Sequence, residues 1–229
     1  MLIGGIQKLS LIDFPGKIAA VVFAQGCDFL CPFCHNPELI PPSGNGMILE
    51  SDVLNFLSDN LKMLEGVCVT GGEPTGRSDL PEFIRKIRSL GLAVKLDTNG
   101  SSPEMIANLL SLDLVDYIAM DIKAAWENYP RAIRSLHAAA AAEKVKKSLS
   151  LISGSGIDHE FRTTVFPGVH SMDDFVSIAG YLHDGEKYFI QNIRLDKTLD
   201  EIVSEERLSA SAIAGELKKV FPHLHIDWR

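Results

Sequence analysis

A single stretch carries more information than any other part of this chain: Ile18-Ala-Ala-Val-Val-Phe-Ala24-Gln-Gly-Cys27-Asp-Phe-Leu-Cys31-Pro-Phe-Cys34-His35-Asn36. The apolar run 18–24 predicts a buried strand. Three cysteines follow at C-x3-C-x2-C spacing, and Pro32 among them favours a loop over a helix. Thiolates suit iron–sulfur clusters, zinc or copper(I), and a cubane [4Fe–4S] cluster held wholly by protein usually takes four of them. Cys27, Cys31 and Cys34 therefore predict a cluster in which one iron is open to another ligand.

Other uses of these cysteines stay open on the residues alone. A structural zinc site needs a fourth ligand, which His35 or Cys68 could supply, although the chain has no second C-x2-C pair. Buried thiols without any metal are the remaining alternative. Cys68 itself lies inside a predicted strand, and we interpret it as a small core hydrophobe.

Composition predicts an ordinary globular protein. The chain has 229 residues, 46% hydrophobic and 23% charged, and nothing marks a linker or repeat, so we expect one domain over residues 1–229. The formal net charge of −8 argues against a nucleic-acid partner. The sequence shows neither an apolar run of membrane-spanning length nor a signal peptide. We therefore expect no membrane association and a cytoplasmic location, where thiols stay reduced.

Short apolar runs alternate with amphipathic stretches along the chain. Predicted strands are 18–24, 67–70, 93–97, 117–122, 160–165 and 187–193, with a further candidate at 224–228. Predicted helices include 51–64, 79–91, a long alanine-rich helix over 131–151, and the stretches 171–183 and 205–219. This order predicts an α/β fold with a parallel sheet and outer helices. The periodicity leaves open whether the sheet forms a partial barrel or an open doubly wound sheet.

Unusual polar residues cluster at or just after the end of each of the first six predicted strands. The clusters are Cys27 to His35, Gly71-Gly72-Glu73-Pro74, Asp97-Thr98-Asn99-Gly100, Asp121 with Lys123, Arg162 with Thr163 and Thr164, and Gln191 with Asn192. Functional groups of parallel α/β folds gather at the carboxyl ends of the strands, so we expect these clusters to meet at one rim. Plainer interpretations exist, since the glycine-rich segments could be simple turns and Asp121 could merely pair with Lys123. The histidines other than His35 are expected on the surface or in loops.

Taken together, these motifs resemble a known family. The cysteine spacing, with Phe33 before the third cysteine, is similar to the signature of radical S-adenosylmethionine (SAM) enzymes, and residues 71–74 resemble that superfamily's SAM-amine motif. The strings 25–36, 97–100, 121–123 and 162–168 resemble the activating enzymes of glycyl-radical proteins. The opening, residues 5–16, is similar to the start of anaerobic ribonucleoside-triphosphate reductase activating proteins. The resemblance extends from about residue 5 to 195, with its core motifs within 18–195.

The resemblance implies a partial (β/α)6 radical SAM barrel and a cluster site. Cys27, Cys31 and Cys34 would hold a [4Fe–4S] cluster, and SAM would chelate the fourth iron through its amino and carboxylate groups. Phe33 would lie against the adenine of SAM. Beyond the cluster and SAM, no further catalytic residue is implied.

The remaining implied roles concern SAM itself. Backbone groups of Gly71, Gly72 and Glu73 would receive the SAM amine. The methionyl carboxylate or ribose of SAM would lie near four polar residues: Asp97, Thr98, Asp121 and Arg162. A cation would lie there too and offset the clustered negative charge. An arginine suits bidentate carboxylate binding better than a lysine does.

The implied reaction is the one-electron cleavage of SAM to methionine and a 5′-deoxyadenosyl radical, which then removes a Cα hydrogen from a glycine of a partner protein. The partner would be an anaerobic ribonucleoside-triphosphate reductase. Some activating enzymes carry an extra ferredoxin-like insert with further cysteines; with four cysteines this chain cannot, so flavodoxin or ferredoxin would supply the electron. Two alternatives remain: a small-molecule radical SAM enzyme such as a 7-carboxy-7-deazaguanine synthase, and a non-catalytic iron–sulfur electron carrier. Lys123 and Gln191 receive no role.

Overall fold

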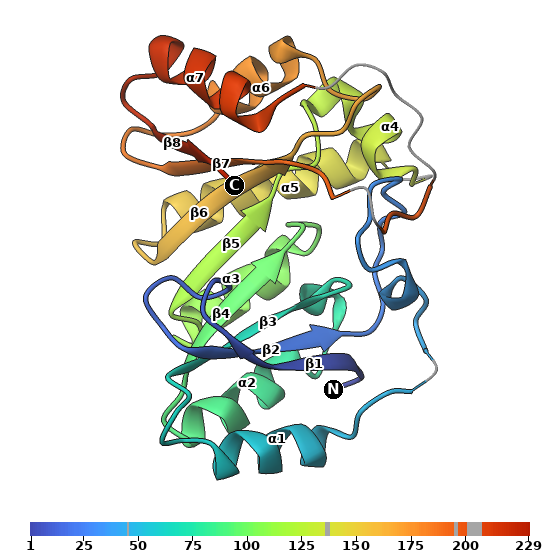
Figure 1. Ribbon diagram of the computed structural model, residues 1–229, viewed down its shortest axis with the longest axis vertical. Coiled ribbons are helices and arrows are strands. Elements are labelled where there is room, and N and C mark those ends of the chain that lie inside the picture. Colours follow the sequence, from blue (N-terminus) through green and yellow to red (C-terminus); the bar gives the residue numbers. More distant parts are fainter. Residues whose placement is uncertain (45, 136–137, 195–196, 201–207) are drawn as a thin grey trace.

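The computed structural model describes residues 1–44, 46–135, 138–194, 197–200 and 208–229. Its centre is one sheet of eight strands, in which every strand lies beside the next one in the chain (Figure 1). The strands are β1 (Ile3–Ser10), β2 (Ala19–Ala24), β3 (Gly66–Gly71), β4 (Ala93–Thr98), β5 (Tyr117–Asp121), β6 (Asp158–Thr164), β7 (Lys187–Gln191) and β8 (His225–Trp228). All neighbouring pairs from β2 to β8 are parallel, so the parallel sheet predicted from the sequence is confirmed.

Strand β1 is the element that the sequence pattern did not predict. It pairs antiparallel with β2 at the edge of the sheet, with register shifts between Ile3 and Gly5 and between Gln7 and Ser10. Two adjacent glycines and the polar end of the segment obscure the alternation by which strands are recognised. A strand at the edge of a sheet pairs with one neighbour only, so it can form even where the alternation of apolar and polar residues is weak.

The two faces of the parallel strands have different chemistry. Val67, Val69, Val94 and Leu96 are fully buried in the large core that the sheet shares with the helices. The alternate residues Cys68, Lys95 and Asp97 and their counterparts on β5 and β6 point to the opposite face, because successive side chains of a strand alternate. The helices lie on the outer side of the curved sheet (Figure 1), which leaves the polar face on the inside.

Seven α-helices cover the outer face within the described chain. They are α1 (Glu50–Asp59), α2 (Leu80–Ser89), α3 (Pro103–Ser111), α4 (Tyr129–Ile133), α5 (Ala138–Ser153), α6 (Met172–Ala179) and α7 (Ala210–Val220). Short 3-10 turns lie at Pro37–Leu39, Pro74–Gly76 and Trp126–Asn128. Part of the predicted helix 205–219, residues 205–207, lies outside the described residues.

The long helix predicted over 131–151 is wrong: two helices occupy that stretch. Helix α4 ends at Ile133, and Arg134 adopts a left-handed conformation with φ 47°. The alanine-rich run forms α5 alone, from Ala138 onward. The break has a tertiary cause, because the Ile133 carbonyl accepts a hydrogen bond from the Leu30 amide of the cysteine loop at 2.9 Å. Helical propensity cannot report such a contact.

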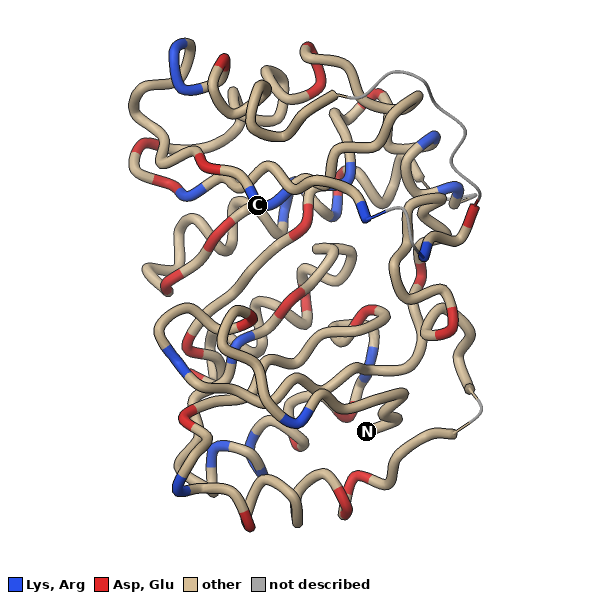
Figure 2. The backbone as a smooth tube through the Cα atoms, in the orientation of Figure 1, with Lys and Arg blue, Asp and Glu red and all other residues tan. Residues whose placement is uncertain are grey.

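The sheet is curved but not closed. Among the strands of the described chain, β1 pairs with β2 alone, apart from an isolated bridge from Ile3 to Ile48, and β8 pairs with β7 alone, so the edges of the sheet stay apart and the fold is a partial barrel, as the resemblance implied. Acidic and basic residues are interspersed over the whole described backbone (Figure 2). None of the described helices is long and apolar enough to cross a lipid bilayer.

Candidate functional site

A cavity of about 800 Å³ lies at the carboxyl ends of the strands and reaches into the inside of the sheet. It is lined by Cys27, Cys31, Phe33, Cys34, Gly71, Gly72, Glu73, Asp97, Thr98, Asp121 and Arg162, which is the complete set of predicted site residues. Residues distant in sequence thus meet at one rim, as the strand-end rule predicted. The cavity is also lined by His35, Lys123 and Gln191, which were not among the predicted site residues.

The cysteine loop is irregular and is fixed by its backbone. Gly26 and Cys27 donate their amides to the carbonyls of Leu39 and Ile40 at 2.8 and 3.0 Å. The buried Gln25 side chain donates to the carbonyls of Glu38 and Pro41 at 3.1 and 2.8 Å, so the chain that follows the cysteines is tied back to their start. Because these hydrogen bonds fix both ends of the cysteine loop, its side chains are held in place although the loop is not helical.

The chemistry of the three thiols fits a soft metal cluster. Cys27, Cys31 and Cys34 are all free, and all three face the same cavity. Burial raises the pKa of Cys31 to about 12 and also raises that of Cys27, so thiolates here require a bound cation to stabilise them. Among the described residues no three histidine, cysteine or acidic side chains already stand in an arrangement that would hold a metal ion.

The two glycines after β3 allow a close approach of two backbone segments. Gly71 has φ +114°, and a Cβ on it would lie 2.5 Å from the Ala24 nitrogen. A Cβ on Gly72 would lie 2.1 Å from the Gly26 carbonyl oxygen. The amides of Gly72 and Glu73 donate to Ala24 and Gly26 at 2.9 and 2.7 Å. The glycine turn therefore packs directly on the start of the cysteine loop and fixes the position of that loop.

The Glu73 side chain ties the ends of two strands together. Its carboxylate is buried and accepts hydrogen bonds from the Thr75 amide (3.0 Å), the Thr98 hydroxyl (2.7 Å) and the Asn99 amide (2.6 Å). Burial raises the pKa of Glu73 to about 7 despite these donors, which favour the charged form. Because Thr98 and Asn99 lie at the end of β4 and the segment that follows, the carboxylate joins the ends of β3 and β4. The Glu73 amide is bonded to Gly26 and its carbonyl accepts the Gly76 amide at 3.2 Å, so the second lone pair of that carbonyl oxygen is what Glu73 leaves for a ligand.

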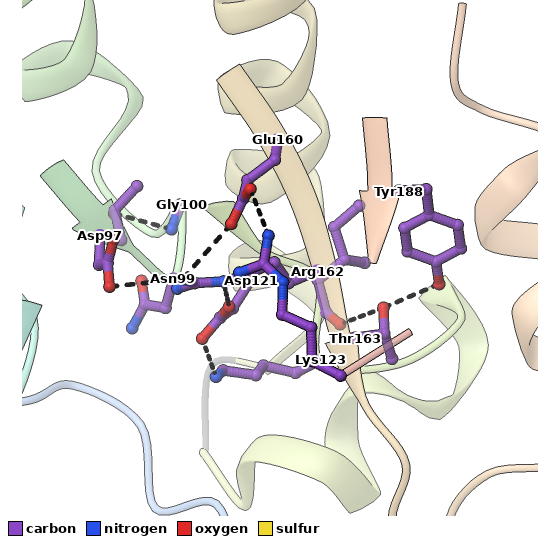
Figure 3. A network of polar contacts seen from close by, with 12 residues as sticks. Asp97, Asn99, Gly100, Asp121, Lys123, Glu160, Arg162, Thr163 and Tyr188 are labelled. Atoms are coloured by element: carbon purple, nitrogen blue, oxygen red, sulfur yellow. Dashed lines mark hydrogen bonds and ion pairs between the residues drawn. The ribbon is translucent and has the colours of Figure 1, made fainter. Parts of the chain in front are cut away.

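An ion-pair network surrounds Arg162 on the inner face (Figure 3). Its Nε donates to Asp121 at 2.7 Å, and its Nη1 lies 3.4 Å from Asp97. Lys123 pairs with Asp121 at 2.9 Å, and Lys95 pairs closely with Asp97. Burial alone would raise the pKa of Asp97 and of Asp121, but Arg162 and the lysines outweigh it and hold both below their usual values. The plain interpretation of Asp121 with Lys123 as an ion pair is confirmed, within a larger network.

Phe33 is buried against other aromatic residues. Its ring lies 5.0 Å from that of Phe166, and Lys123 Nζ lies 5.9 Å from its centroid. His170 lies in a loop, as expected, but it is buried rather than on the surface. Its Nδ1 accepts from the Phe166 amide at 2.9 Å, so its Nε2 carries the hydrogen donated to the Lys123 carbonyl at 2.8 Å. His170 thus fixes the segment that follows β5.

Sequence reasoning missed three charged residues of the inner face: Lys95, Glu160 and Arg229. Lys95 and Glu160 are 2% and 1% exposed, respectively, although they stand in otherwise ordinary strands. The signal that could have found Lys95 is its position two residues before Asp97, which places both on one face of β4. No comparable signal marks Arg229, which follows β8 directly and reaches Glu160 of β6 at 2.7 Å.

Comparison with known proteins gives consistent results. The model of the Radical SAM superfamily matches residues 21–182. A Methanocaldococcus jannaschii protein assigned by name as a glycyl-radical enzyme activating enzyme is 33% identical over 202 residues, which cover 87% of this chain and 83% of that protein. The pyruvate formate-lyase-activating enzyme of Listeria monocytogenes is 34% identical over 131 residues, which cover 52% of this chain and 51% of that enzyme.

The fold is also shared with a solved structure. Streptococcus suis SuiB, crystallised with S-adenosylmethionine, superposes with a TM-score of 0.65 over 91% of this chain at 15% identity. The match covers 49% of SuiB, and at this identity it reports the fold alone.

Proposed function

The chain belongs to the radical SAM superfamily, in the branch of glycyl-radical enzyme activating enzymes, and we propose that its partner is an anaerobic ribonucleoside-triphosphate reductase. The observation that carries the assignment of the site is the single cavity in which three free thiols, the glycine turn and the Arg162 network meet. A scattered arrangement of the same motifs would not support a common reaction.

The proposed cofactors are a [4Fe–4S] cluster and SAM. When bound, they supply a radical, formed by reductive cleavage of SAM, that removes a hydrogen from a glycine Cα of the partner. Cys27, Cys31 and Cys34 would hold the cluster, since their thiols are the soft donors that face the cavity. Phe33 would border the adenine from its place against Phe166.

The glycine turn and the ion-pair network would hold SAM. The backbone of residues 71–73 would receive the SAM amine, because side chains are absent from the turn at Gly71 and Gly72 and the Glu73 carboxylate is already bonded. Arg162 would meet the SAM carboxylate or ribose, with Asp97, Thr98 and Asp121 around it. The buried pairs keep the Arg162 guanidinium in one orientation, which matters for bidentate binding.

The choice of partner rests on the N-terminal stretch 5–16, whose resemblance is to activating proteins of anaerobic reductases. That stretch forms much of β1 and the loop after it, and its residues Ile12 and Asp13 line the cavity. Two residues of the stretch on which the choice of partner rests thus line the candidate site, which supports the proposal. We propose flavodoxin or ferredoxin as the electron donor, since the one cysteine of this sequence that remains beside the three proposed ligands, Cys68, is too few to hold a second cluster.

Electron paramagnetic resonance tests the proposal. The anaerobically reduced protein, SAM and the candidate reductase are expected to yield the doublet of a glycyl radical, and the reductase with alanine in place of its glycine should give none. Turnover of a carboxy-tetrahydropterin, with no radical on the reductase, would assign the protein to the deazaguanine synthases. A cluster that binds no SAM would instead indicate an electron carrier.

A further inference from the structure

Glu160 of β6 is a buried charged group that the proposed cofactor site does not use. One of its carboxylate oxygens, Oε2, accepts hydrogen bonds from the Tyr117 hydroxyl (3.0 Å) and from Arg229 Nη2 (2.7 Å). The other oxygen, Oε1, has no hydrogen-bond partner in the described chain, and Arg162 Nη1 lies 3.9 Å from it. The side chain is 1% exposed. A buried carboxylate oxygen without a donor is costly and calls for a functional explanation.

The register of β6 places this oxygen beside the cavity. Residues 160, 162 and 164 point to the same face of the strand, and Arg162 and Thr164 both line the cavity. Arg229, which binds the other oxygen, lines it as well. Glu160 itself is not among the described residues that line the cavity; it lies behind Arg162 and Arg229, next to the Arg162 network (Figure 3).

The charges around Glu160 indicate what kind of donor fits. The ion pairs that connect through Arg162 and Glu160 join four cations to three carboxylates within the described chain: Lys95, Lys123, Arg162 and Arg229 with Asp97, Asp121 and Glu160. A further cation would increase this excess of positive charge in a buried site. An anionic group would be repelled by Oε1 itself. A neutral N–H donor satisfies the oxygen without changing the charge.

Resting on the proposed function, we propose that Glu160 Oε1 accepts a hydrogen bond from a main-chain amide of the partner segment that carries the reacting glycine. An extended segment offers amides at regular spacing, so one such bond fixes how far the segment enters the cavity. Arg229 has a side chain that is 40% exposed, stacks on Phe189 at 3.8 Å and bonds Glu160 at 2.7 Å, so the entering segment has to displace it toward solvent to reach Oε1. Glu160 is then a specificity-determining residue for a polypeptide substrate.

Calorimetry with the reconstituted protein, SAM and the candidate reductase, without reductant, tests this. Glu160→Ala should raise the dissociation constant of the complex about tenfold, the effect of losing one hydrogen bond to a charged group. Glu160→Gln, which keeps an acceptor oxygen of the same shape, should raise it by about threefold, because bonds to ionised acceptors are stronger. The matched control is Tyr117→Phe, which removes a donor to Oε2 alone and should stay within about twofold of wild type.

A second measurement identifies the amide. Reductase variants that place proline at one residue at a time around the glycine each remove one N–H. One of these proline variants should bind the wild-type protein more weakly than the unmodified reductase does. The same proline should weaken binding to Glu160→Ala much less, since that protein already lacks the hydrogen bond that the proline removes. Equal proline effects with both proteins, or an unchanged dissociation constant in Glu160→Ala, would overturn the inference and leave the proposed function standing. Failure of the wild-type protein to form the glycyl radical would overturn the proposed function first.

Discussion

At the scale of single residues, the four cysteines divide into three that face the cavity and one that does not. Cys68 is fully buried in the middle of β3, and burial raises the pKa of its thiol, so it is expected to remain a neutral core residue. Alanine at Cys27, Cys31 or Cys34 should each abolish retention of the roughly four irons of a cubane cluster, whereas Cys68→Ala should keep them. Iron and sulfide analysis after anaerobic reconstitution measures this. Loss of iron in the Cys68 variant alone would point to a different ligand set.

His170 should make stability depend on pH. Burial lowers its pKa from the ordinary value of 6.5, and its Nδ1 must stay unprotonated to accept the Phe166 amide. Below about pH 6.5 the unfolded chain takes up a proton that the folded chain refuses, so the free energy of unfolding falls as the pH drops. His170→Gln removes this titration. The stability gap between wild type and variant in urea titrations should therefore narrow between about pH 7 and pH 5, and a constant gap would refute the neutral assignment.

At the scale of elements, the glycine turn after β3 allows a sharp comparison. A Cβ at position 72 would lie 2.1 Å from the Gly26 carbonyl oxygen, whereas one at position 76 would meet nothing within 4 Å. Gly72→Ala is expected to cost about 2 kcal/mol or more, since two backbone segments must separate, and to impair iron retention as well. Gly76→Ala should change stability by less than about 1 kcal/mol. Urea denaturation and iron analysis of both variants provide the measurements, and similar results for the two would show that the contact is dispensable.

Most elements of the fold can be predicted from the local sequence pattern. The others depend on contacts between distant residues, which no local pattern contains. The apolar runs of β2 to β7 stand out because strands buried on the helix side carry valine, leucine and isoleucine. The break at Arg134 escaped prediction because it depends on the tether from Ile133 to Leu30. The rule that polar residues gather at the carboxyl ends of parallel strands depends on topology, and it correctly predicted that the clusters meet in one cavity. Glu160 and Arg229 meet across β6, β7 and β8, so their pairing needed the structure.

At the scale of the whole molecule, the cavity is lined from both edges of an incomplete barrel. Ile12 and Asp13 come from the β1 side, and Asn192 and Arg229 come from the β7–β8 side. An open flank of this kind admits solvent as well as a polypeptide, so a docked partner should exclude water from the reaction. We expect 5′-deoxyadenosine to form slowly from SAM in the reduced protein alone and about tenfold faster with the reductase. Chromatography measures the product. Equal rates with and without the partner would show that docking does not close the site.

A reductase whose glycine is replaced by alanine separates two causes of such an acceleration. If closure of the open flank is what matters, this variant should still increase the yield of 5′-deoxyadenosine. If hydrogen transfer from the glycine is what matters, the increase should disappear. The two outcomes distinguish the contribution of docking from that of the chemical step.

The sequential order of the strands also bears on how the protein is made. Because each strand pairs with its immediate successor, the sheet can grow one unit at a time as the chain leaves the ribosome, with little need for distant segments to find each other. The cysteines and the glycine turn emerge early, within the first third of synthesis. The tether from Leu30 to Ile133 can form only after more than half of the chain has been synthesised. During that interval the nascent cysteine loop lacks one of the restraints that hold it in the finished protein.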